Sequence, residues 1–321
     1  MSYWGHLDDA GMATMIRDAE TEGWRVAMRR HLPEAVWSHI DEPGRTDGLF
    51  FVPQSSDQVV LDAGCMWGGL TVPLARRFAR VHGLDATLAS LDFLRVRARE
   101  EGLTNLELAC GSLLSLPYRD GAFDLVIVNG VLEWVGFGRD YVVDRDFGRA
   151  RPDGGERGAD PAAMQDEALR EVRRVLRRGG RLYLAIENRY AYRYFLGAPD
   201  DHAGLRFASL LPRRAADLYM RARLGEGYRT YTYSAAGLRR LLARAGLTVR
   251  ALYGCFDSYH QPQAVIPIEE RKMLAFYLRR FRLPNVPAWK RAAFRVALAA
   301  GLGPWLVPSF IVVAERPGAS S

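Results

Sequence analysis

Lysine is almost absent from this chain of 321 residues: Lys272 and Lys290 are the two lysines, and every other basic residue is arginine. An arginine bias can reflect genome composition, so the formal net charge of +7 does not by itself predict nucleic-acid binding. Because no RNA-binding module accompanies the charge, we expect no nucleic-acid partner. The excess of positive charge is concentrated near the end of the sequence, since residues 271–314 contain eight basic residues and no acidic one.

Cysteine is also scarce. Cys65, Cys110 and Cys255 are far apart and odd in number, with neither zinc-ligand spacing nor a disulfide framework. We therefore expect a reducing, cytoplasmic location and predict no metal site. The N-terminus has no basic start followed by an apolar run, so we expect no secretory signal.

Residues 296–314 carry no charge and are numerous enough to span a bilayer as a helix. They also contain Gly301, Gly303, Pro304 and Pro308, which would break a helix in the middle of the membrane. We predict instead a helix end, a turn and a final strand at 310–314.

The most informative stretch runs from Val59 to Leu70. An apolar run rich in β-branched residues stops at Asp62 and Gly64, and a glycine-bearing turn then leads into a helical pattern. A buried parallel strand joins a helix in this way while leaving room for a ligand at its carboxyl end. The glycines allow close backbone approach and unusual dihedral angles, so the stretch predicts a site for a nucleoside-like cofactor.

Strand and helix patterns alternate after this point. This alternation predicts an α/β fold, Rossmann-like and doubly wound, with a mostly parallel sheet and right-handed crossovers. We expect a helix at 234–245, with Ser234 as N-cap and Gly246 just past its end. Other helices are expected at 70–78, 88–101 and 164–178, and seven strands at 59–63, 80–84, 106–109, 123–129, 181–186, 248–253 and 310–314.

We predict a helical N-terminal cap at 1–57, with helices at 12–30 and 33–40, which covers the core or closes over the site. The main domain is expected at 58–321. Insertions at 136–162 and 188–233 interrupt it, and 268–301 is predicted to form basic amphipathic helices. Helices of this kind, with basic residues over 271–295, either cover the core or lie on an anionic membrane surface.

Distinctive residues follow the first four predicted strands, whose carboxyl ends lie along one edge of a parallel sheet. Asp85 comes 21 residues after Gly64, a spacing that suits a hydrogen bond from a ribose diol to the carboxylate. The Gly-x-Gly-x-x-Gly pattern of dinucleotide dehydrogenases is missing. The other strand-end groups are Gly111-Ser112-Leu113 and Asn129-Gly130 with Glu133-Trp134.

In this ordered series, residues 58–188 resemble the class I S-adenosylmethionine-dependent methyltransferases. The resemblance rests on 60–65, 83–85, 116–118 with 123–126, 129–133, 169–172, 175–176 and 179–180. It implies S-adenosyl-L-methionine as cofactor, with its methionine part over Gly64, its ribose on Asp85, its adenine beside Ser112 and Leu113, and its ammonium near the Asn129 carbonyl. The cofactor-binding residues predicted in this way are Asp62, Gly64, Cys65, Met66, Gly68, Asp85, Ala86, Gly111, Ser112, Leu113, Asn129 and Gly130.

Three residues depart from the family pattern. Met66 stands where the family usually has glycine, and Ser112 stands where it often has aspartate. Trp134 follows Glu133 where many small-molecule methyltransferases have histidine. Its ring could form an apolar wall or a cation–π contact near the sulfonium, or it could pack in the core.

Methyl transfer to a hydroxyl needs a base, which we expect in the 188–233 insertion. His202 and Asp201 are predicted as base and orienting group, with Glu133 as a further catalytic candidate. The alternative is that 200–202 is a solvated turn. Aromatic and arginine side chains suit saccharides and anionic groups. The predicted substrate-binding residues are Glu187, Asn188, Arg189, Tyr190, Arg206, Tyr228, Tyr231 and Tyr233.

The run 187–207 resembles methyltransferases found with cell-surface polysaccharide assembly enzymes, which implies a sugar or sugar-linked acceptor. The sequence therefore predicts O-methylation of a saccharide or other small hydroxylated acceptor. Two alternatives remain open. One is a non-catalytic partner with this fold in a surface-polysaccharide complex. The other is a non-methylating enzyme that uses the same cofactor, such as a cyclase.

Overall fold

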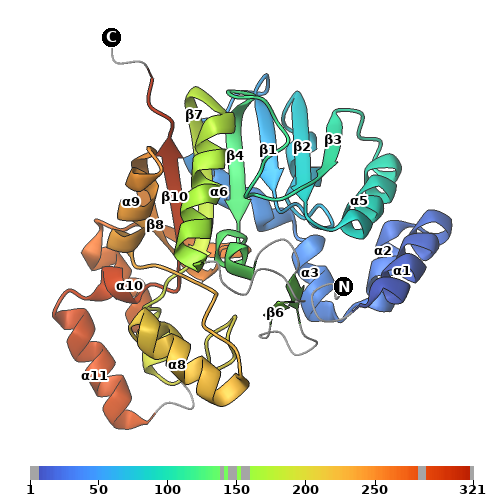
Figure 1. Ribbon diagram of the computed structural model, residues 1–321. Helices are drawn as coiled ribbons and strands as arrows, with labels where there is room; N and C mark the ends of the chain where they lie inside the picture. The colour runs from blue at the N-terminus through green and yellow to red at the C-terminus, as the bar shows by residue number, and fades with distance from the viewer. Residues whose placement is uncertain (1–6, 138–140, 144–149, 153–159, 281–286, 319–321) are drawn as a thin grey trace.

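A computed structural model describes residues 7–137, 141–143, 150–152, 160–280 and 287–318. Its centre is an eight-stranded sheet in the order β3-β2-β1-β4-β7-β10-β8-β9 (Figure 1). The expected α/β fold is confirmed, but the predicted count of seven strands is wrong. The strands are β1 Val59–Ala63, β2 Arg80–Asp85, β3 Leu106–Cys110, β4 Phe123–Asn129, β7 Leu176–Glu187, β8 Thr248–Ser258, β9 Gln261–Pro267 and β10 Ser309–Glu315.

The five strands from β3 to β7 run parallel to one another. β10 lies antiparallel between β7 and β8, and β9 folds back antiparallel on β8. β9 is the strand that the sequence did not reveal, because two prolines and two glutamines break its apolar pattern. A proline-containing strand is tolerated at a sheet edge, where β9 lies.

Both faces of the sheet are buried. Alternate residues of β1 and β4 enter two separate apolar clusters, with Leu61 and Val126 in one and Val60 and Leu125 in the other. Helices α6 (Pro161–Val175) and α9 (Ala235–Arg244) contribute to the first cluster. The 3-10 helix η1 (Pro43–Phe51) and α4 (Thr71–Ala75) contribute to the second. Burial on both faces explains the continuous apolar runs of these strands.

Several predicted helix limits are wrong. Gly23, with φ of 93°, divides the expected helix 12–30 into α1 (Asp9–Glu22) and α2 (Trp24–His31). The helix expected at 70–78 shortens to α4. α6 ends at Val175 rather than at 178, because Leu176 already pairs with Phe123 in the sheet. The prediction for α9 is confirmed, since the Ser234 hydroxyl accepts a hydrogen bond from the Gly237 amide.

The N-terminal helices pack on α5 (Leu88–Glu100), close to the β2–β3 side of the sheet (Figure 1). Trp24 donates its backbone N–H to Glu100, and the Arg97 guanidinium lies 4.0 Å from the centre of the Trp24 ring. Trp67 and Phe93 complete this buried cluster. α3 (Glu34–Ile40) follows. The domain boundary at 57 stays a prediction.

Part of the 136–162 insertion lies outside the described residues. Its described part includes the antiparallel pair β5 (Tyr141–Val143) and β6 (Ala150–Pro152). The 188–233 insertion folds into α7 (Tyr192–Phe195), η3 (Ala208–Leu210) and α8 (Arg213–Leu224). Figure 1 shows α8 beyond the end of the sheet toward which the β4 arrow points. The insertion is therefore on the side where strand ends carry the predicted site.

The basic segment forms α10 (Arg271–Arg280) and α11 (Ala288–Ala299), while 281–286 lies outside the described residues. The predicted helix end, turn and final strand are confirmed, because α11 ends at Ala299, a turn follows at 300–301, and β10 comes after it. The short helix α12 (Gly303–Leu306), which lies between the turn and β10, was not predicted. None of the helices in the described part of the chain combines the length and apolarity needed to cross a membrane.

Candidate functional site

The turn after β1 is shaped by backbone conformations that glycine favours. Gly64 and Gly68 have φ of 87° and 82°. A Cβ on Gly64 would lie 2.4 Å from a Val131 methyl carbon, and a Cβ on Gly68 would lie 2.3 Å from a Leu94 methyl carbon. Met66 adopts φ of 46° without being glycine, a strain of the order of 1 kcal/mol. The family departure at Met66 therefore preserves the glycine-like turn.

Asp62 lies under this turn and is buried. Its carboxylate accepts a 2.6 Å hydrogen bond from the Thr71 hydroxyl at the start of α4. Burial raises the pKa of Asp62 to about 6, while the Thr71 hydroxyl and Arg45 lower it. Asp62 therefore ties the strand to the helix that follows, and it is absent from the lining of the cavity described below.

Asp85 at the end of β2 is fixed by three hydrogen bonds. One oxygen accepts from the Met66 amide at 2.8 Å, and the other accepts from the Thr87 amide and hydroxyl at 2.9 and 2.6 Å. Burial raises the pKa of Asp85, against these hydrogen bonds. A carboxylate has about four acceptor positions, so about one remains for a ligand hydroxyl.

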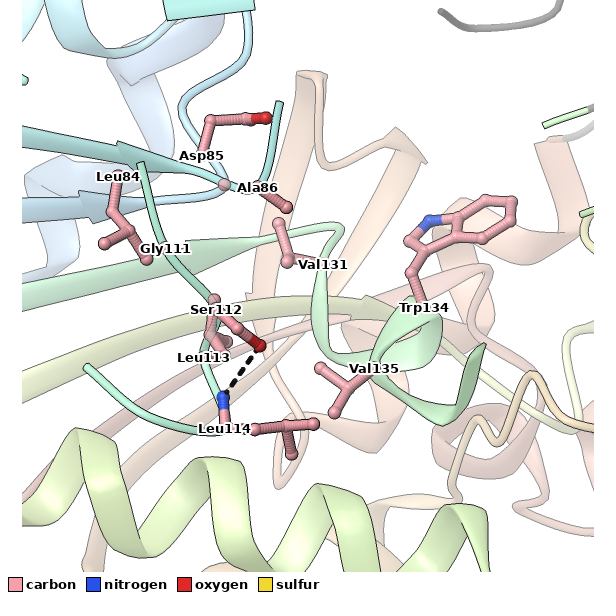
Figure 2. Close-up of a pocket in the computed structure, with 11 residues that line it drawn as sticks. Leu84, Asp85, Ala86, Gly111, Ser112, Leu113, Leu114, Val131, Trp134 and Val135 are labelled. Atoms are coloured by element: carbon pink, nitrogen blue, oxygen red, sulfur yellow. Dashed lines mark hydrogen bonds between the residues drawn. The ribbon is translucent and has the colours of Figure 1, made fainter. Parts of the chain in front are cut away.

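A cavity opens beside Asp85, with about 500 Å³ of empty space including its open mouth. Figure 2 shows Val131, Trp134 and Val135 across the cavity from Asp85, Ala86 and Ser112. The Ser112 hydroxyl accepts a hydrogen bond from the Leu114 amide at 3.2 Å, drawn as a dashed line. The full lining is Gly64, Leu84, Asp85, Ala86, Gly111, Ser112, Leu113, Leu114, Val131, Trp134 and Val135.

The other predicted cofactor residues lie around the cavity rather than in its lining. The Cys65 side chain packs in an apolar cluster with Leu94, where burial raises the pKa of its thiol. Asn129 is buried at the end of β4, and its side-chain nitrogen has no hydrogen-bond partner in the described part of the chain. Gly130 has φ of 69°, and a Cβ there would lie 2.6 Å from the Tyr259 hydroxyl.

These residues fit S-adenosylmethionine. Gly64 leaves the floor of the cavity without a side chain, Asp85 has acceptor capacity for a ribose hydroxyl, and Leu113 supplies an apolar wall. The unpartnered amide nitrogen of Asn129 is a donor without an acceptor near the same strand edge. Ser112 can accept from an adenine amino group, although its hydroxyl already accepts from Leu114.

A second group of polar residues lies next to this cavity. Glu133 belongs to the 3-10 helix η2 (Leu132–Phe137) after β4, and Glu187 ends β7. His202 from the insertion places its Nε2 3.6 Å from a Glu187 oxygen and 3.8 Å from a Glu133 oxygen. The Tyr259 hydroxyl donates to the other Glu187 oxygen at 2.7 Å. Burial and the Glu187 charge hold the pKa of Glu133 well above its ordinary value.

Asp200 contacts both the backbone and the imidazole ring of His202. The Asp200 carboxylate accepts from the His202 and Ala203 amides at 3.0 and 2.8 Å, and it lies 3.9 Å from His202 Nδ1. Asp201, predicted as the orienting partner, instead accepts from the Tyr194 hydroxyl at 2.9 Å and pairs with Arg193. His202 is also buried, at 5% exposure, so 200–202 is not the solvated turn of the alternative interpretation.

Trp134 contacts both the cavity and the polar cluster of Glu133, Glu187 and His202. It lines the cavity, and the centres of its ring and of the His202 ring are 4.8 Å apart at an interplanar angle of 74°. Neither Tyr259 nor the approach of Glu133 to Glu187 was predicted, because residues 133, 187, 202 and 259 form no spaced motif. The cavity walls Leu84, Leu114, Val131 and Val135 were also missed.

Most predicted substrate-binding residues hold the insertion together. Asn188 is buried and donates to the Trp305 and Val307 carbonyls at 2.8 Å each. Arg189 donates to the Ser209 carbonyl at 2.7 Å and lies over the Tyr190 ring. Tyr228 donates to Asp200, and Tyr233 donates to Gln165. The Tyr231 ring lies 3.8 Å from the Arg213 guanidinium, and Arg206 is exposed.

Comparison with known proteins agrees with this geometry. Residues 54–194 match the model of a family described as methyltransferase domain. A malonyl-[acyl-carrier protein] O-methyltransferase of Halorhodospira halophila is 42% identical over 77 residues, which cover 23% of this chain and 25% of that protein. A probable fatty acid methyltransferase of Pseudomonas putida is 40% identical over 79 residues, covering 24% and 20%. The chain thus spans a quarter or less of the length of these relatives.

A solved structure also matches over most of its length. It is the geranyl diphosphate C-methyltransferase of Streptomyces coelicolor A3(2) in complex with Mg²⁺, geranyl diphosphate and S-adenosyl-L-homocysteine. It is 18% identical, covers 98% of this chain and 91% of that chain, and has a TM-score of 0.47. The match to the family model covers residues 54–194, less than half of this chain, and makes that stretch similar to a methyltransferase domain.

Proposed function

We propose that this protein transfers a methyl group from S-adenosylmethionine to a hydroxyl oxygen of a saccharide or another small hydroxylated acceptor. The observation that carries the proposal is the position of Glu133, Glu187 and His202 beside the cavity. An oxygen acceptor needs a group that takes its proton, and these three side chains are such groups. They lie at the strand edge that also carries Asp85.

The cofactor supplies an electrophilic methyl group on a positively charged sulfur. In the transfer, the acceptor oxygen bonds to the methyl carbon, the carbon–sulfur bond breaks with its electron pair left on sulfur, and the hydroxyl proton passes to the Glu133–Glu187–His202 cluster. Asp85 and the Gly64 turn hold one reactant, while the insertion holds the other. Such alignment can contribute about 7–11 kcal/mol to lowering the barrier.

The acceptor class is proposed from the insertion around His202. Aromatic rings and arginines gather there, with Arg213 lying 3.8, 5.7 and 5.5 Å from the ring centres of Tyr231, Tyr228 and Tyr233. Tyr228 is buried, so the half-buried Arg213, Tyr231 and Tyr233 are the proposed contacts. Aromatic and guanidinium surfaces suit sugar faces and attached carboxylates or phosphates. Arg206 is exposed in the same insertion and is the proposed contact for an anionic group on the acceptor.

The test is an assay with isotope-labelled methyl donor and a panel of free sugars, glycosides and sugar phosphates. We expect a product that has gained one methyl group on oxygen, identified by mass spectrometry. A product of unchanged composition would point to the cyclase alternative. Cofactor binding without turnover on any hydroxylated acceptor would support the non-catalytic partner.

We also propose that α10–α12 contact an anionic membrane surface. Large apolar side chains with exposures of 38–69% accompany the eight basic and no acidic residues of 271–314: Met273, Phe276, Tyr277, Trp289, Val296, Leu302 and Trp305. Figure 1 draws α11 at the periphery of the molecule. Apolar and basic groups together suit the headgroup region of an anionic bilayer.

Sedimentation with lipid vesicles tests this contact. We expect binding to phosphatidylglycerol vesicles but not to phosphatidylcholine vesicles, and at least fivefold weaker binding after Phe276→Ala and Trp289→Ala together. Leu218→Ala on α8, also 68% exposed, is the matched control. Equal binding to both kinds of vesicle, or unchanged binding of the double variant, would contradict the contact.

A further inference from the structure

Three side chains that commonly bind metal ions meet at the carboxyl ends of β4 and β7. Glu133, Glu187 and His202 each offer one ligand atom, and these atoms all lie within 4.8 Å of one another. No cysteine or histidine spacing in the sequence predicts this group, because its members come from three separate segments. The chain fold alone brings them together.

The group has more buried acceptors than donors. Glu133 is wholly buried, and neither of its carboxylate oxygens has a hydrogen-bond partner among the described residues. One oxygen of Glu187 is buried and likewise unpartnered in that part of the chain. Buried carboxylates in proteins are normally paired, hydrogen-bonded or bound to metal ions. A positive charge between these oxygens would satisfy all of them.

The distances suit a small cation. His202 Nε2 lies 3.6 Å from the unpartnered Glu187 oxygen and 3.8 Å from a Glu133 oxygen. Ligand atoms about 2.1 Å from one ion are separated by about 3.0–3.4 Å in octahedral or tetrahedral arrangements. All three ligand atoms lie within 4.8 Å of one another, so side-chain shifts of about 1–2 Å at most would bring them into coordination.

The residues that contact the three proposed ligands are also of the kind that supports metal ligands in proteins. The Asp200 carboxylate lies 3.9 Å from His202 Nδ1, the nitrogen that faces away from the two glutamates, and Asp200 is itself held by the Ala203 amide and the Tyr228 hydroxyl. Tyr259 donates to the other oxygen of Glu187. A carboxylate behind a histidine and a hydrogen bond to a ligating carboxylate are the usual supports of metal ligands.

We propose that Glu133, Glu187 and His202 bind a divalent first-row transition-metal ion such as Mn²⁺ or Zn²⁺. Two carboxylates and an imidazole suit these ions better than Ca²⁺ or Mg²⁺, which prefer oxygen ligands throughout. Three protein ligands leave positions for water or for an oxygen of the acceptor.

The role of the ion, unlike its binding, rests on the proposed function. An acceptor hydroxyl bound to the ion loses its proton more easily. Its oxygen then bonds to the methyl carbon as the carbon–sulfur bond breaks, and the proton passes to the second oxygen of Glu133. The ion thus gives the cluster a way to activate an oxygen nucleophile, with Glu133 as the group that takes up the proton.

Metal titration of the full chain tests the site. Protein stripped with a chelator is titrated with Mn²⁺ and followed by electron paramagnetic resonance, and Zn²⁺ is then added as competitor. We expect one tight equivalent, displaced by Zn²⁺, and at least tenfold weaker binding in E133Q and in H202Q. The matched control is E107Q, because Glu107 lies 3.6 Å from His82 Nδ1 in a glutamate–histidine pair elsewhere.

Thermal unfolding provides a second readout. Saturating Mn²⁺ should raise the Tm of the wild-type chain and of E107Q, but not of E133Q or H202Q. If one cluster variant does not fold, the other carries the test. Absence of Mn²⁺ and Zn²⁺ binding, or equal binding in the cluster variants, would overturn the proposal.

Failure of this inference is separable from failure of the proposed function. Binding of S-adenosyl-L-homocysteine should be the same with and without chelator, because Asp85 and the Gly64 turn are not part of the cluster. Methyl transfer that persists in the chelated protein would overturn the metal role and leave the proposed function standing. Metal binding without methyl transfer to any acceptor would overturn the proposed function and leave the metal site standing.

Discussion

The site has two parts that are built differently. The cofactor side consists of the Gly64 turn with Asp62 and Asp85, and the proposed acceptor side consists of Glu133, Glu187 and His202. On the cofactor side, Asp62 and Asp85 have their carboxylates held by hydrogen bonds from Thr71, Met66 and Thr87. On the acceptor side, Glu133 is buried more completely and both of its oxygens lack a partner among the described residues. The carboxylates of the first side already have hydrogen-bond donors in the absence of a ligand, whereas the carboxylate oxygens of Glu133 on the second side have none among the described residues.

The two sides differ in which groups form them. Backbone groups in a short turn fix the cofactor side, so the shape of that side persists without its ligand. Side chains from η2, β7 and the insertion form the proposed acceptor side, and three of their carboxylate oxygens lack a hydrogen-bond partner among the described residues. Changes on the acceptor side should therefore alter chemistry, and changes on the cofactor side should alter binding and stability.

The largest effect is expected from Glu133→Gln. It removes the unpartnered carboxylate while keeping its shape, and loss of a group that handles the acceptor proton costs about 100-fold to 10,000-fold in turnover. Affinity for S-adenosyl-L-homocysteine should stay within twofold of the wild type. Steady-state kinetics and calorimetry measure the two quantities. A variant with full turnover would remove Glu133 from the chemistry.

Asn188→Ala should mainly affect stability. It leaves the Trp305 and Val307 carbonyls without their buried hydrogen bonds, which costs about 3 kcal/mol of unfolding free energy. Urea unfolding measures the loss, and the KM for the acceptor should not change in the folded variant. An unchanged unfolding free energy with a raised KM would instead assign Asn188 to substrate binding.

Asp62→Asn should change how stability depends on pH. The pKa of Asp62 is raised from 3.8 to about 6 by burial, so the folded state binds this proton more tightly than the unfolded state. Wild-type stability should therefore fall as pH rises from 4 to 7.5, by about 2 kcal/mol from this group. The variant should lack this contribution in urea unfolding at the two pH values. Identical pH dependence in both proteins would contradict the assignment.

Met66→Gly should have the smallest effect. Glycine relieves the strain of φ 46°, which is about 1 kcal/mol, but the Met66 side chain also packs against the N-terminal cluster. The two contributions oppose each other, so the unfolding free energy should change by less than about 1 kcal/mol. Cofactor affinity should change by less than threefold. A tenfold gain in affinity would mean that Met66 distorts the turn.

The cofactor side could be predicted from the sequence because its signals are local. β1 and β4 have the expected limits, and Gly64, Asp85 and Ser112 line one cavity because parallel strands end at one edge. The limit of α6 could not be predicted, since it depends on the pairing of Leu176 with Phe123 across the sheet.

The acceptor side could be predicted only in part. His202 and Glu133 were candidates from their place in the chain, but their approach to Glu187 depends on how the insertion folds. Asp200, rather than the neighbouring Asp201, lies beside the imidazole, because a tight turn directs the Asp200 carboxylate to the His202 and Ala203 amides. The other Asp200 oxygen accepts a hydrogen bond from the Tyr228 hydroxyl, a contact between distant segments that sequence spacing does not predict.

The central claim is that the cavity beside Asp85 binds S-adenosylmethionine. Calorimetric titration of the pure protein with S-adenosyl-L-homocysteine tests it most directly, with Asp85→Ala and the matched surface variant Asp92→Ala in parallel. We predict one site, at least tenfold weaker binding in Asp85→Ala, and unchanged binding in Asp92→Ala. Absence of binding to the wild-type protein, or equal affinity in Asp85→Ala, would contradict the claim.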